Sequence, residues 1–229
     1  MKIKYSALVS DARGKLNGSV ASKNRYGSYL RNKITPVNPQ STAQMEARQR
    51  FGALSSMWKS LTQSQRNSWL SGVKAFPFTD IFGDIKHLSG NSLFVKLNSN
   101  LEKIGSAPIL SAPEATGVST LPDFELSPIK SAGVLTGLQL EFSDFAVPSG
   151  ESLVVYATPP QGPGKNFVKS EYRFIGTATV DDDLGDIFSI YASRFGTNAP
   201  ANQKIFVRIA LVNTTTGEQG VPLESVATL

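Results

Sequence analysis

The sequence of 229 residues contains no cysteine and only one histidine. The absence of cysteine excludes disulfides and thiolate metal sites, although it fits any cellular compartment. A Ser-His-Asp relay or a histidine-based metal site would have to be built around His87, and neither a G-x-S-x-G turn nor a second histidine accompanies it. We therefore expect an ordinary packed or surface imidazole at His87, no cofactor and no enzymatic activity.

Long apolar runs are also missing. No stretch of about 18 apolar residues occurs in the sequence, so no helix is expected to span a membrane. The first ten residues are a poor secretory signal, because Lys4 and Ser6 interrupt a short apolar stretch. The protein is therefore expected to be made in a cytoplasm, and to be used there or assembled there into something larger.

Charged residues make up only 18% of the chain, but they are unevenly distributed. Residues 1–75 carry 13 Lys or Arg against 2 Asp or Glu, whereas residues 106–229 carry 7 against 13. This split sets one end of the chain against the other electrostatically, and it predicts two surfaces with different partners. It argues less for a pocket in which one small molecule is processed.

Residues 1–40 are predicted to form an extended basic arm with too few large apolar side chains to become ordered alone. Residues 15–20 and 28–31 alternate in polarity, and they suit a hairpin around residues 24–27. The basic residues and tyrosines fit contact with a protein, contact with a nucleic acid, or exposure to water. Protein contact is favoured, because the composition suits strand addition to a neighbour's sheet. The candidate partner-binding residues are Arg13, Lys15, Lys23, Arg25, Tyr26, Tyr29, Arg31 and Lys33.

Residues 41–105 are predicted to form a helical domain. Residues 41–44 (Ser-Thr-Ala-Gln) and 62–65 (Thr-Gln-Ser-Gln) have the spacing of capping boxes, which begin helices. A partly buried connector over residues 75–90 precedes a third helix, which ends at Gly105. The first helix carries an apolar stripe that is expected to face the core, together with Trp69 of the second helix. The stripe consists of Ala47, Phe51, Leu54, Trp58 and Leu61.

Residues 106–229 are predicted to form an immunoglobulin-like or fibronectin-like β-sandwich. Prolines exclude a helix from the first part, and short alternating runs separated by turn-rich pieces then recur. The cysteine pair and the buried tryptophan of antibody domains are absent. The expected fold class is therefore α+β, with an extended arm and a small helical bundle followed by an all-β sandwich. The expected strands include residues 138–142, 152–157, 173–178, 187–191 and 204–212.

Three motifs in this half have both a chemical and a plain interpretation. The four aspartates between residues 181 and 186 lack the spacing of a calcium loop, so a solvated turn is preferred. Residues 162–165 (Gly-Pro-Gly-Lys) lack the full phosphate-loop pattern and are interpreted as a strand connection. Glu141 and Asp144 are the candidate catalytic pair for a third hypothesis, a carbohydrate-active enzyme. Their short separation in sequence places them at the end of one strand rather than across a cleft, so this hypothesis is disfavoured.

One set of motifs runs through both halves of the chain. Its first part reads G-x-Y-x-R … P-x-N-P … Q … R-x-x-F … W … L-T … Q-R … W, from Gly27 to Trp69. Its second part consists of Val155–Thr158, Phe167–Val168, Phe206–Arg208 and Thr216–Gly217. This set resembles a pattern of bacteriophage virion proteins and of uncharacterised proteins from Bacteroides-type bacteria and their phages. The motifs are structural and none is a catalytic signature, so the resemblance implies a component of a phage particle.

The resemblance and the charge distribution together predict a non-enzymatic structural protein of a tailed phage, located in the virion after assembly in the host cytoplasm. A head auxiliary (decoration) role is the first choice, and a tail or neck component is the alternative. The expected partners are other virion proteins, foremost the major capsid protein, and copies of the same chain. A second hypothesis is a nucleic-acid-binding protein, whose basic arm contacts nucleic acid while the β domain is only a spacer.

Overall fold

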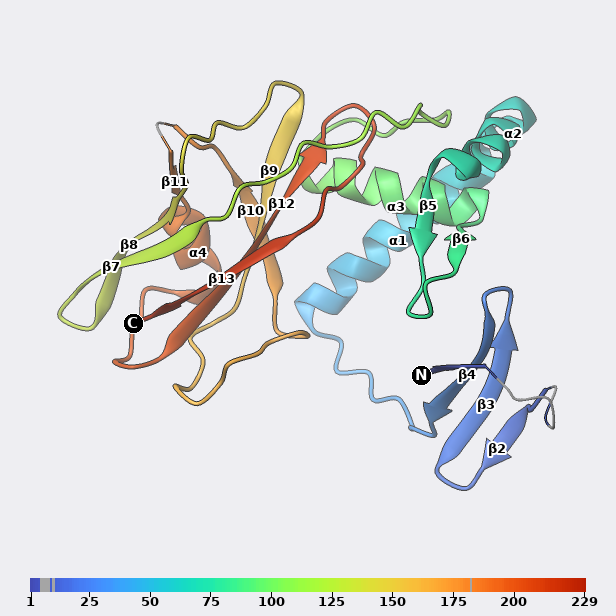
Figure 1. The fold of residues 1–229 in the computed structure, drawn as a ribbon, viewed down its shortest axis with the longest axis horizontal. Helices are drawn as coiled ribbons and strands as arrows, with labels where there is room; N and C mark the ends of the chain where they lie inside the picture. Colours follow the sequence, from blue (N-terminus) through green and yellow to red (C-terminus); the bar gives the residue numbers. More distant parts are fainter. Residues whose placement is uncertain (5–8, 10, 182) are drawn as a thin grey trace.

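The computed structural model describes residues 1–4, 9, 11–181 and 183–229. Over these residues the fold is α+β, which confirms the predicted class at this level, and all the sheets are antiparallel. Figure 1 shows three regions along the chain: a small N-terminal sheet at the end of an extended segment, a group of helices, and a larger β region that contains the C-terminus.

The N-terminal region is a sheet in the order β1-β4-β3-β2. Two-residue turns, Asn17-Gly18 and Arg25-Tyr26, connect its last three strands. Asn17 has a φ of 48°, which is the left-handed backbone that such tight hairpin turns require. The strands are β1 (Lys2–Ile3), β2 (Gly14–Leu16), β3 (Ser19–Asn24) and β4 (Gly27–Asn32).

This sheet changes the interpretation of the N-terminal region. The predicted hairpin is confirmed, because Asn24 pairs with Gly27 across the turn. The prediction of an extended arm has to be corrected for residues 1–32, since backbone hydrogen bonds between strands joined by tight turns assemble a sheet there. Residues 33–41 form no helix or strand and are exposed throughout, and we call this segment the tether.

Three helices pack around one apolar core. Trp69 and Phe94 are fully buried in this core, and their ring centroids lie 5.3 Å apart in an edge-to-face arrangement. The Trp58 ring lies 5.5 Å from the ring of Phe94, so both tryptophans help to fill the space between the helices, as expected. The helices are α1 (Thr42–Ser60), α2 (Gln63–Gly72) and α3 (Gly90–Lys103).

The two predicted capping boxes have different outcomes. The Thr62 hydroxyl accepts a hydrogen bond from the Gln65 N–H, and the Gln65 side chain accepts one from the Thr62 N–H, so this box is confirmed. At the start of α1 the prediction is wrong, because the Ser41 side chain makes no capping hydrogen bond. The Gln44 Oε1 atom has no hydrogen-bond partner there, so the reciprocal bond of a capping box is missing too.

The predicted apolar stripe of α1 is confirmed only in the second half of the helix. Leu54 and Leu61 are buried, whereas Phe51 is 62% exposed and Ala47 is exposed as well. In the first half of the helix, polar side chains meet α3, as shown by an ion pair of 3.3 Å between the Arg50 Nε atom and a carboxylate oxygen on α3. The expectation that Phe51 belongs to the core is therefore wrong.

The connector between α2 and α3 contains a short hairpin of β5 (Pro77–Thr79) and β6 (Ile85–His87). Its tip, residues 80–84, carries two aspartates, Asp80 and Asp84. His87 is exposed, and its Nδ1 atom lies 3.1 Å from the carbonyl oxygen of Val73. The expectation of an ordinary imidazole at this position is consistent with this environment.

Two antiparallel sheets of the C-terminal region enclose the larger core. The first has the order β10-β9-β12-β13 and the second has the order β11-β8-β7. Both sheets contribute completely buried side chains to this core, Leu153 and Ile209 from the first sheet and Leu138 from the second. The strands are β7 (Glu125–Ser131), β8 (Val134–Glu141), β9 (Glu151–Ala157), β10 (Arg173–Ala178), β11 (Leu184–Asp186), β12 (Lys204–Asn213) and β13 (Leu223–Thr228).

Four of the five expected strands in this region correspond to β8, β9, β10 and β12. The expectation of a strand over residues 187–191 is wrong, because α4 (Phe188–Phe195) lies there. Phe188, Tyr191 and Phe195 recur at helical spacing and pack against the core, and Tyr191 is buried. A run of five residues is too short to distinguish this helical pattern from the alternation of a strand.

The helices and the C-terminal region meet through a close backbone approach. The Asn100 side chain on α3 donates a hydrogen bond of 3.0 Å to the carbonyl of Gly217, in the loop between β12 and β13. A Cβ atom at Gly217 would lie 2.4 Å from the carbonyl oxygen of Leu97, so only glycine fits there. The Lys103 Nζ atom also donates to the Tyr156 hydroxyl of β9 at 3.0 Å. These contacts join the two regions into one body.

Candidate partner-binding surface

The N-terminal sheet lacks a core of its own. None of the residues described between 1 and 41 is buried, and Leu16 of β2 is 75% exposed. The same stretch, residues 1–41, carries eight Lys or Arg and one Asp, a formal charge of +7. A sheet of this size usually needs a packed apolar face for independent stability. The sheet is therefore a charged surface that gains order from contacts with other groups.

The strand register distributes the predicted binding residues over the two faces of the sheet. Lys15 pairs with Val20, and Val20 pairs with Arg31, so these three side chains share one face. Tyr29 lies two residues from Arg31 on β4 and shares that face, whereas Lys23 lies on the opposite one. The sequence grouped these residues as one basic set, but only the pairing of the strands assigns their faces.

The remaining predicted residues lie in turns and at the ends of strands. Arg13 precedes β2, and its Nε atom forms an ion pair of 3.1 Å with Asp11. In the turn between β3 and β4, the guanidinium of Arg25 lies 5.4 Å from the centroid of the Tyr26 ring. The Tyr26 ring in turn meets Phe78 of β5 edge to face, with 6.0 Å between the centroids. Tyr26 and its turn are thus engaged by the chain itself.

Four of the predicted cations are free to meet a partner. Lys15, Lys23, Arg31 and Lys33 are exposed, and none of them forms an ion pair within the described part of the chain. The Lys33 N–H donates to the Gly18 carbonyl at 2.8 Å, which places this residue beside the turn between β2 and β3. Unpaired cations on an exposed sheet suit an acidic surface or phosphate groups.

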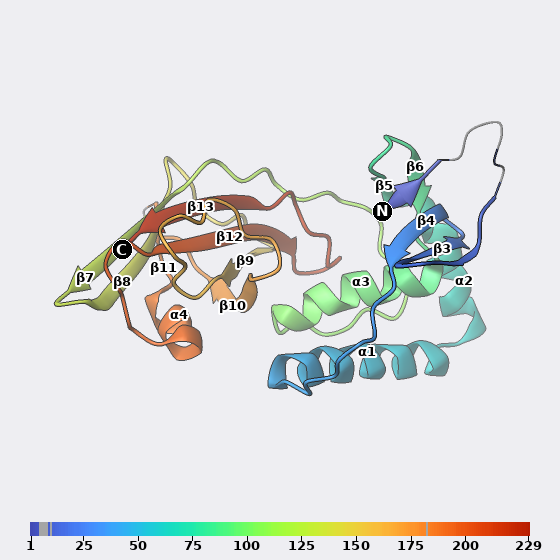
Figure 2. The ribbon, with the colours of Figure 1, turned by 90° about the horizontal axis from the view of Figure 1, so that it is seen from below.

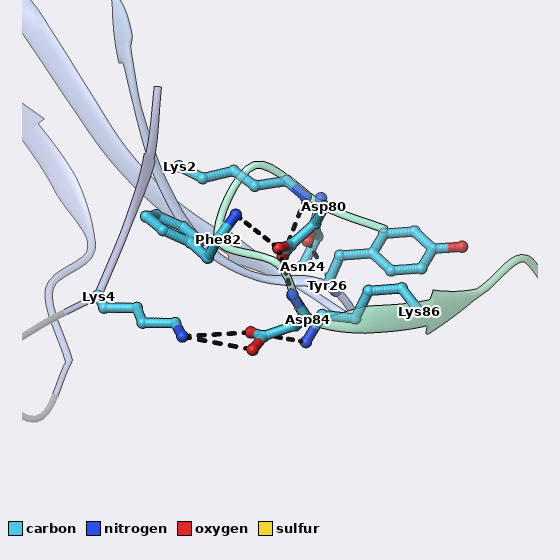
Figure 3. Close-up of polar contacts among 8 residues, drawn as sticks. All are labelled: Lys2, Lys4, Asn24, Tyr26, Asp80, Phe82, Asp84 and Lys86. Carbon is cyan, nitrogen blue, oxygen red and sulfur yellow. Dashed lines mark hydrogen bonds and ion pairs between the residues drawn. The ribbon is translucent and has the colours of Figure 1, made fainter. Parts of the chain in front are cut away.

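A second group of lysines holds the sheet to the rest of the molecule (Figure 3). The Lys2 Nζ atom lies 3.5 Å from an Asp80 carboxylate oxygen, and the Lys4 Nζ atom lies 3.3 Å from one of Asp84. Lys4 also lies 5.1 Å from the centroid of the Phe82 ring. Sequence analysis missed these contacts, because the partners are about 80 positions apart and only the opposite signs of their charges hint at pairing.

Asp80 is the best-defined group of this junction. Its side chain is 2% exposed, whereas that of Lys2 is 33% exposed. Burial acts to raise the pKa of the Asp80 carboxyl, but the backbone N–H groups of Phe82 and Asp84 and the Lys2 ammonium outweigh it, so the pKa lies below its ordinary value. The Phe82 N–H donates to the carboxylate at 2.8 Å and the Asp84 N–H at 3.2 Å. Asp80 is therefore an ionised anchor for the sheet.

An apolar depression lies where β4 runs into the tether. It has a volume of about 650 Å³ and is lined by Met1, Leu30, Ile34 and Pro36, together with Arg31 and Asn32. Met1 is 78% exposed and Ile34 is 71% exposed, so the protein itself leaves these side chains uncovered. An apolar strip beside unpaired cations is the composition of many protein-binding surfaces.

The motifs of the C-terminal half have plain structural roles. Asp183 accepts a hydrogen bond from the Phe145 N–H, and the described residues contain no group of three His, Asp or Glu that suits a metal ion. Asp182 lies outside the described residues. Lys165 forms an ion pair with Glu171 and a hydrogen bond of 2.9 Å with Gln161, in the connection between β9 and β10. These side chains are satisfied within the fold.

The two carboxylates considered for glycoside chemistry do not face each other across a cavity. Glu141 ends β8, and Asp144 follows in a turn with a φ of 54°. A depression of about 460 Å³ is lined by Glu141 together with Asp123 and Glu125, but Asp144 is not among its lining residues. The structure therefore does not bring the proposed pair together at this site.

Comparisons with protein-family models, with curated proteins and with solved structures gave no match. Within the described residues, no helix combines the length and the apolar character that crossing a bilayer requires.

Proposed function

We propose that this chain is a non-enzymatic structural protein of a phage particle, whose basic N-terminal sheet binds an acidic surface of another virion protein. The observation that carries this proposal is a sheet with a formal charge of +7 over residues 1–41, no buried side chain among its described residues, and four unpaired cations. A head auxiliary role bound to the major capsid protein is the first choice, and a tail or neck component is the alternative. The resemblance to virion proteins supports the same assignment.

The division of the sheet into two groups of residues supports binding. Lys2 and Lys4 hold the sheet to the molecule, whereas Lys15 and Arg31 remain unpaired on one face. Charged groups of this kind steer a partner and fix its orientation, while apolar contacts supply more of the affinity. The exposed strip around Met1 and Ile34 provides such apolar area next to Arg31. Together these features suit a partner surface that is acidic and partly apolar.

We further propose that residues 106–229 act as an immunoglobulin-like or fibronectin-like module, which packs against neighbouring proteins or faces outward. The strand order supports this proposal. If the strands are lettered A, B, C, C′, E, F and G in chain order, the sheets read A-B-E and C′-C-F-G. Sheets of this kind packed face to face are typical of such sandwiches. The formal charge of −6 over these residues, 7 basic against 13 acidic, also makes the module complementary to the N-terminal sheet of another copy.

Binding to empty heads of the phage whose genome is proposed to encode the chain tests the proposal. The full chain and two double charge reversals are pelleted with the heads: Lys15→Glu with Arg31→Glu on one face of the sheet, and Lys130→Glu with Lys169→Glu, two exposed lysines of the C-terminal region, as the matched control. We expect the first double variant to bind at least about tenfold more weakly, a loss of about 1.4 kcal/mol, and the control to bind like the unmodified chain. Absence of binding by the unmodified chain contradicts the proposal, and equal binding by all three proteins rejects this face as the contact.

Unpaired cations also favour a nucleic-acid partner as the second candidate function. The affinity of such a protein for duplex DNA falls steeply as salt is added, because bound counterions are released. Fluorescence anisotropy with a labelled duplex distinguishes the two functions. Loss of all binding at about 100 mM salt removes the nucleic-acid candidate and leaves the protein partner.

A further inference from the structure

The N-terminal sheet and its docking site behave as two separable parts. The described ion pairs and ring contacts between the sheet and the rest of the chain all go to the β5–β6 hairpin: Lys2 to Asp80, Lys4 to Asp84 and Phe82, and Tyr26 to Phe78. In Figure 2 the sheet lies beside this hairpin, away from the C-terminal region. The hairpin is thus a compact receptor for the sheet.

We infer that the sheet of one copy docks on the β5–β6 hairpin of a second copy, so that neighbouring chains exchange their N-terminal sheets. This inference rests on the proposed function in assembly and identifies one partner, a second copy of the chain. The contacts are the same whether the two parts belong to one chain or to two. Exchange of identical elements between protomers in this way is a low-cost route to oligomers.

The junction is built from few contacts, and each of them is re-formed on the hairpin of the second copy, so the exchanged sheet keeps the contacts that order it. The Lys4–Asp84 pair is largely exposed, with 62% and 41% of the two side chains accessible, and ion pairs of this kind contribute little to stability. Tyr26 and Phe78 are only half-buried, so part of each ring is already exposed before the sheet detaches. The hydrogen bonds between the four strands lie within the sheet and stay intact during exchange.

The tether has the length and the stiffness that exchange requires. Residues 33–41 are exposed throughout, and the hydrogen bond of 2.9 Å from Arg48 to the Asn38 side chain joins this segment to α1. A fully extended chain of this length spans about 30 Å. Pro36 and Pro39 keep the segment from folding into a helix or pairing as a strand. The sheet is thereby held within reach of a neighbour.

Concentration decides which copy is used. A short tether gives the sheet of the same chain an effective concentration in the millimolar range, so an isolated molecule in dilute solution keeps its own sheet. When copies are packed together at comparable local concentration, the hairpin of a neighbour competes on equal terms. The inference therefore predicts little exchange at about 10 µM and substantial exchange at about 1 mM.

Zero-length cross-linking tests the exchange. A carbodiimide joins a lysine amine to a carboxylate as an amide with loss of water, and it needs the close contact that Lys2 has with Asp80 and Lys4 with Asp84. Chains labelled with ¹⁴N and with ¹⁵N are mixed in equal amounts, equilibrated, cross-linked and digested. At about 1 mM we expect about half of the sheets to exchange and half of those exchanges to join different labels, so about a quarter of all Lys2–Asp80 and Lys4–Asp84 links carry both labels, and few do at about 10 µM.

The chain supplies its own controls. Lys86 and Asp84 lie within one hairpin with 3.5 Å between their charged atoms, so their link arises within one chain and reports random encounters if it carries both labels. The Lys2→Arg/Lys4→Arg variant keeps the charges but removes the reactive amines, and the mixed-label links must disappear. The Asp80→Asn/Asp84→Asn variant removes the two carboxylates on the hairpin, so Lys2 and Lys4 have none to link to there, while Lys15 and Arg31 are unchanged.

The outcomes separate this inference from the proposed function. Lys2–Asp80 and Lys4–Asp84 links that carry a single label at about 1 mM overturn the exchange, even if the chain binds phage heads. Mixed-label links at the frequency of the Lys86–Asp84 control overturn it as well. Failure of the chain to bind phage heads contradicts the proposed function instead, and it leaves a positive exchange result as a property of the isolated protein.

Discussion

The two β regions of this chain are both antiparallel, but they differ in where their order comes from. In the C-terminal region, Leu153, Val155 and Ile209 are completely inaccessible to solvent between two sheets. In the N-terminal sheet, the most buried apolar residues, such as Leu30, are only half-buried, and Leu16 is 75% exposed. Backbone hydrogen bonds form strands in both regions. Burial of apolar area makes the first region stable by itself and leaves the second dependent on contacts.

The sharpest test of this difference is a matched pair of leucine truncations. Leu153→Ala removes a fully buried side chain from β9, and we expect a loss of about 3 to 5 kcal/mol because a cavity remains in the core. Leu16→Ala in β2 should change the free energy of unfolding by less than about 0.5 kcal/mol. Urea unfolding followed by circular dichroism measures both. Similar losses for the two variants would show that the N-terminal sheet has a core after all.

A second test compares the junctions that join the regions. Gly217 has a φ of 73° and lies against the backbone of α3, so Gly217→Ala should cost about 3 kcal/mol. Gly105 has a nearly equal φ of 72° but open space around it, so Gly105→Ala should cost only about 1 to 2 kcal/mol. Thermal or urea unfolding gives both values. Equal losses would mean that the approach to α3 is looser than its backbone geometry implies.

The boundary between the tether and the helices gives a third test. Thr62→Ala removes a complete capping box and should destabilise the protein by about 1 kcal/mol. Ser41→Ala, at the end of the tether, removes a side chain without a capping hydrogen bond and should change the stability by a few tenths of a kcal/mol at most. If Ser41→Ala proves as costly as Thr62→Ala, the tether is more tightly joined to α1 than its exposure indicates.

The smallest expected effect is the response of the sheet's junction to acid. The folded pKa of Asp80 lies below its ordinary value of 3.8, so the contribution of the carboxylate is complete above that value and is lost as the pH falls through the folded pKa. The Phe82 amide donates to this carboxylate, and its NMR chemical shift reports the ionisation. We expect a midpoint below 3.8 that disappears in Asp80→Asn. A midpoint at or above 3.8 would show that Lys2 and the backbone donors do not hold the anion.

Local patterns predicted much of the fold. Predictions that depend on neighbours in the sequence are confirmed. They comprise the turn at residues 24–27, the capping box at Thr62 and the strands β8, β9, β10 and β12. The run that became α4 was misassigned, because a short apolar segment suits either a strand or a helix until a core selects one. Phe51 was assigned to the core because periodicity alone does not reveal which turns of a helix are covered.

For the candidate surface, the sequence by itself determined the excess of positive charge at one end of the chain, the hairpin turn and the basic residues that surround it. Only the tertiary structure decided which lysines are engaged and which are free. Lys2 and Lys4 meet Asp80 and Asp84 because folding brings β1 beside the β5–β6 hairpin, while the strand register leaves Lys15 and Arg31 together on one face. Charge is a property of composition, but pairing requires proximity, and proximity between distant residues is set by the fold.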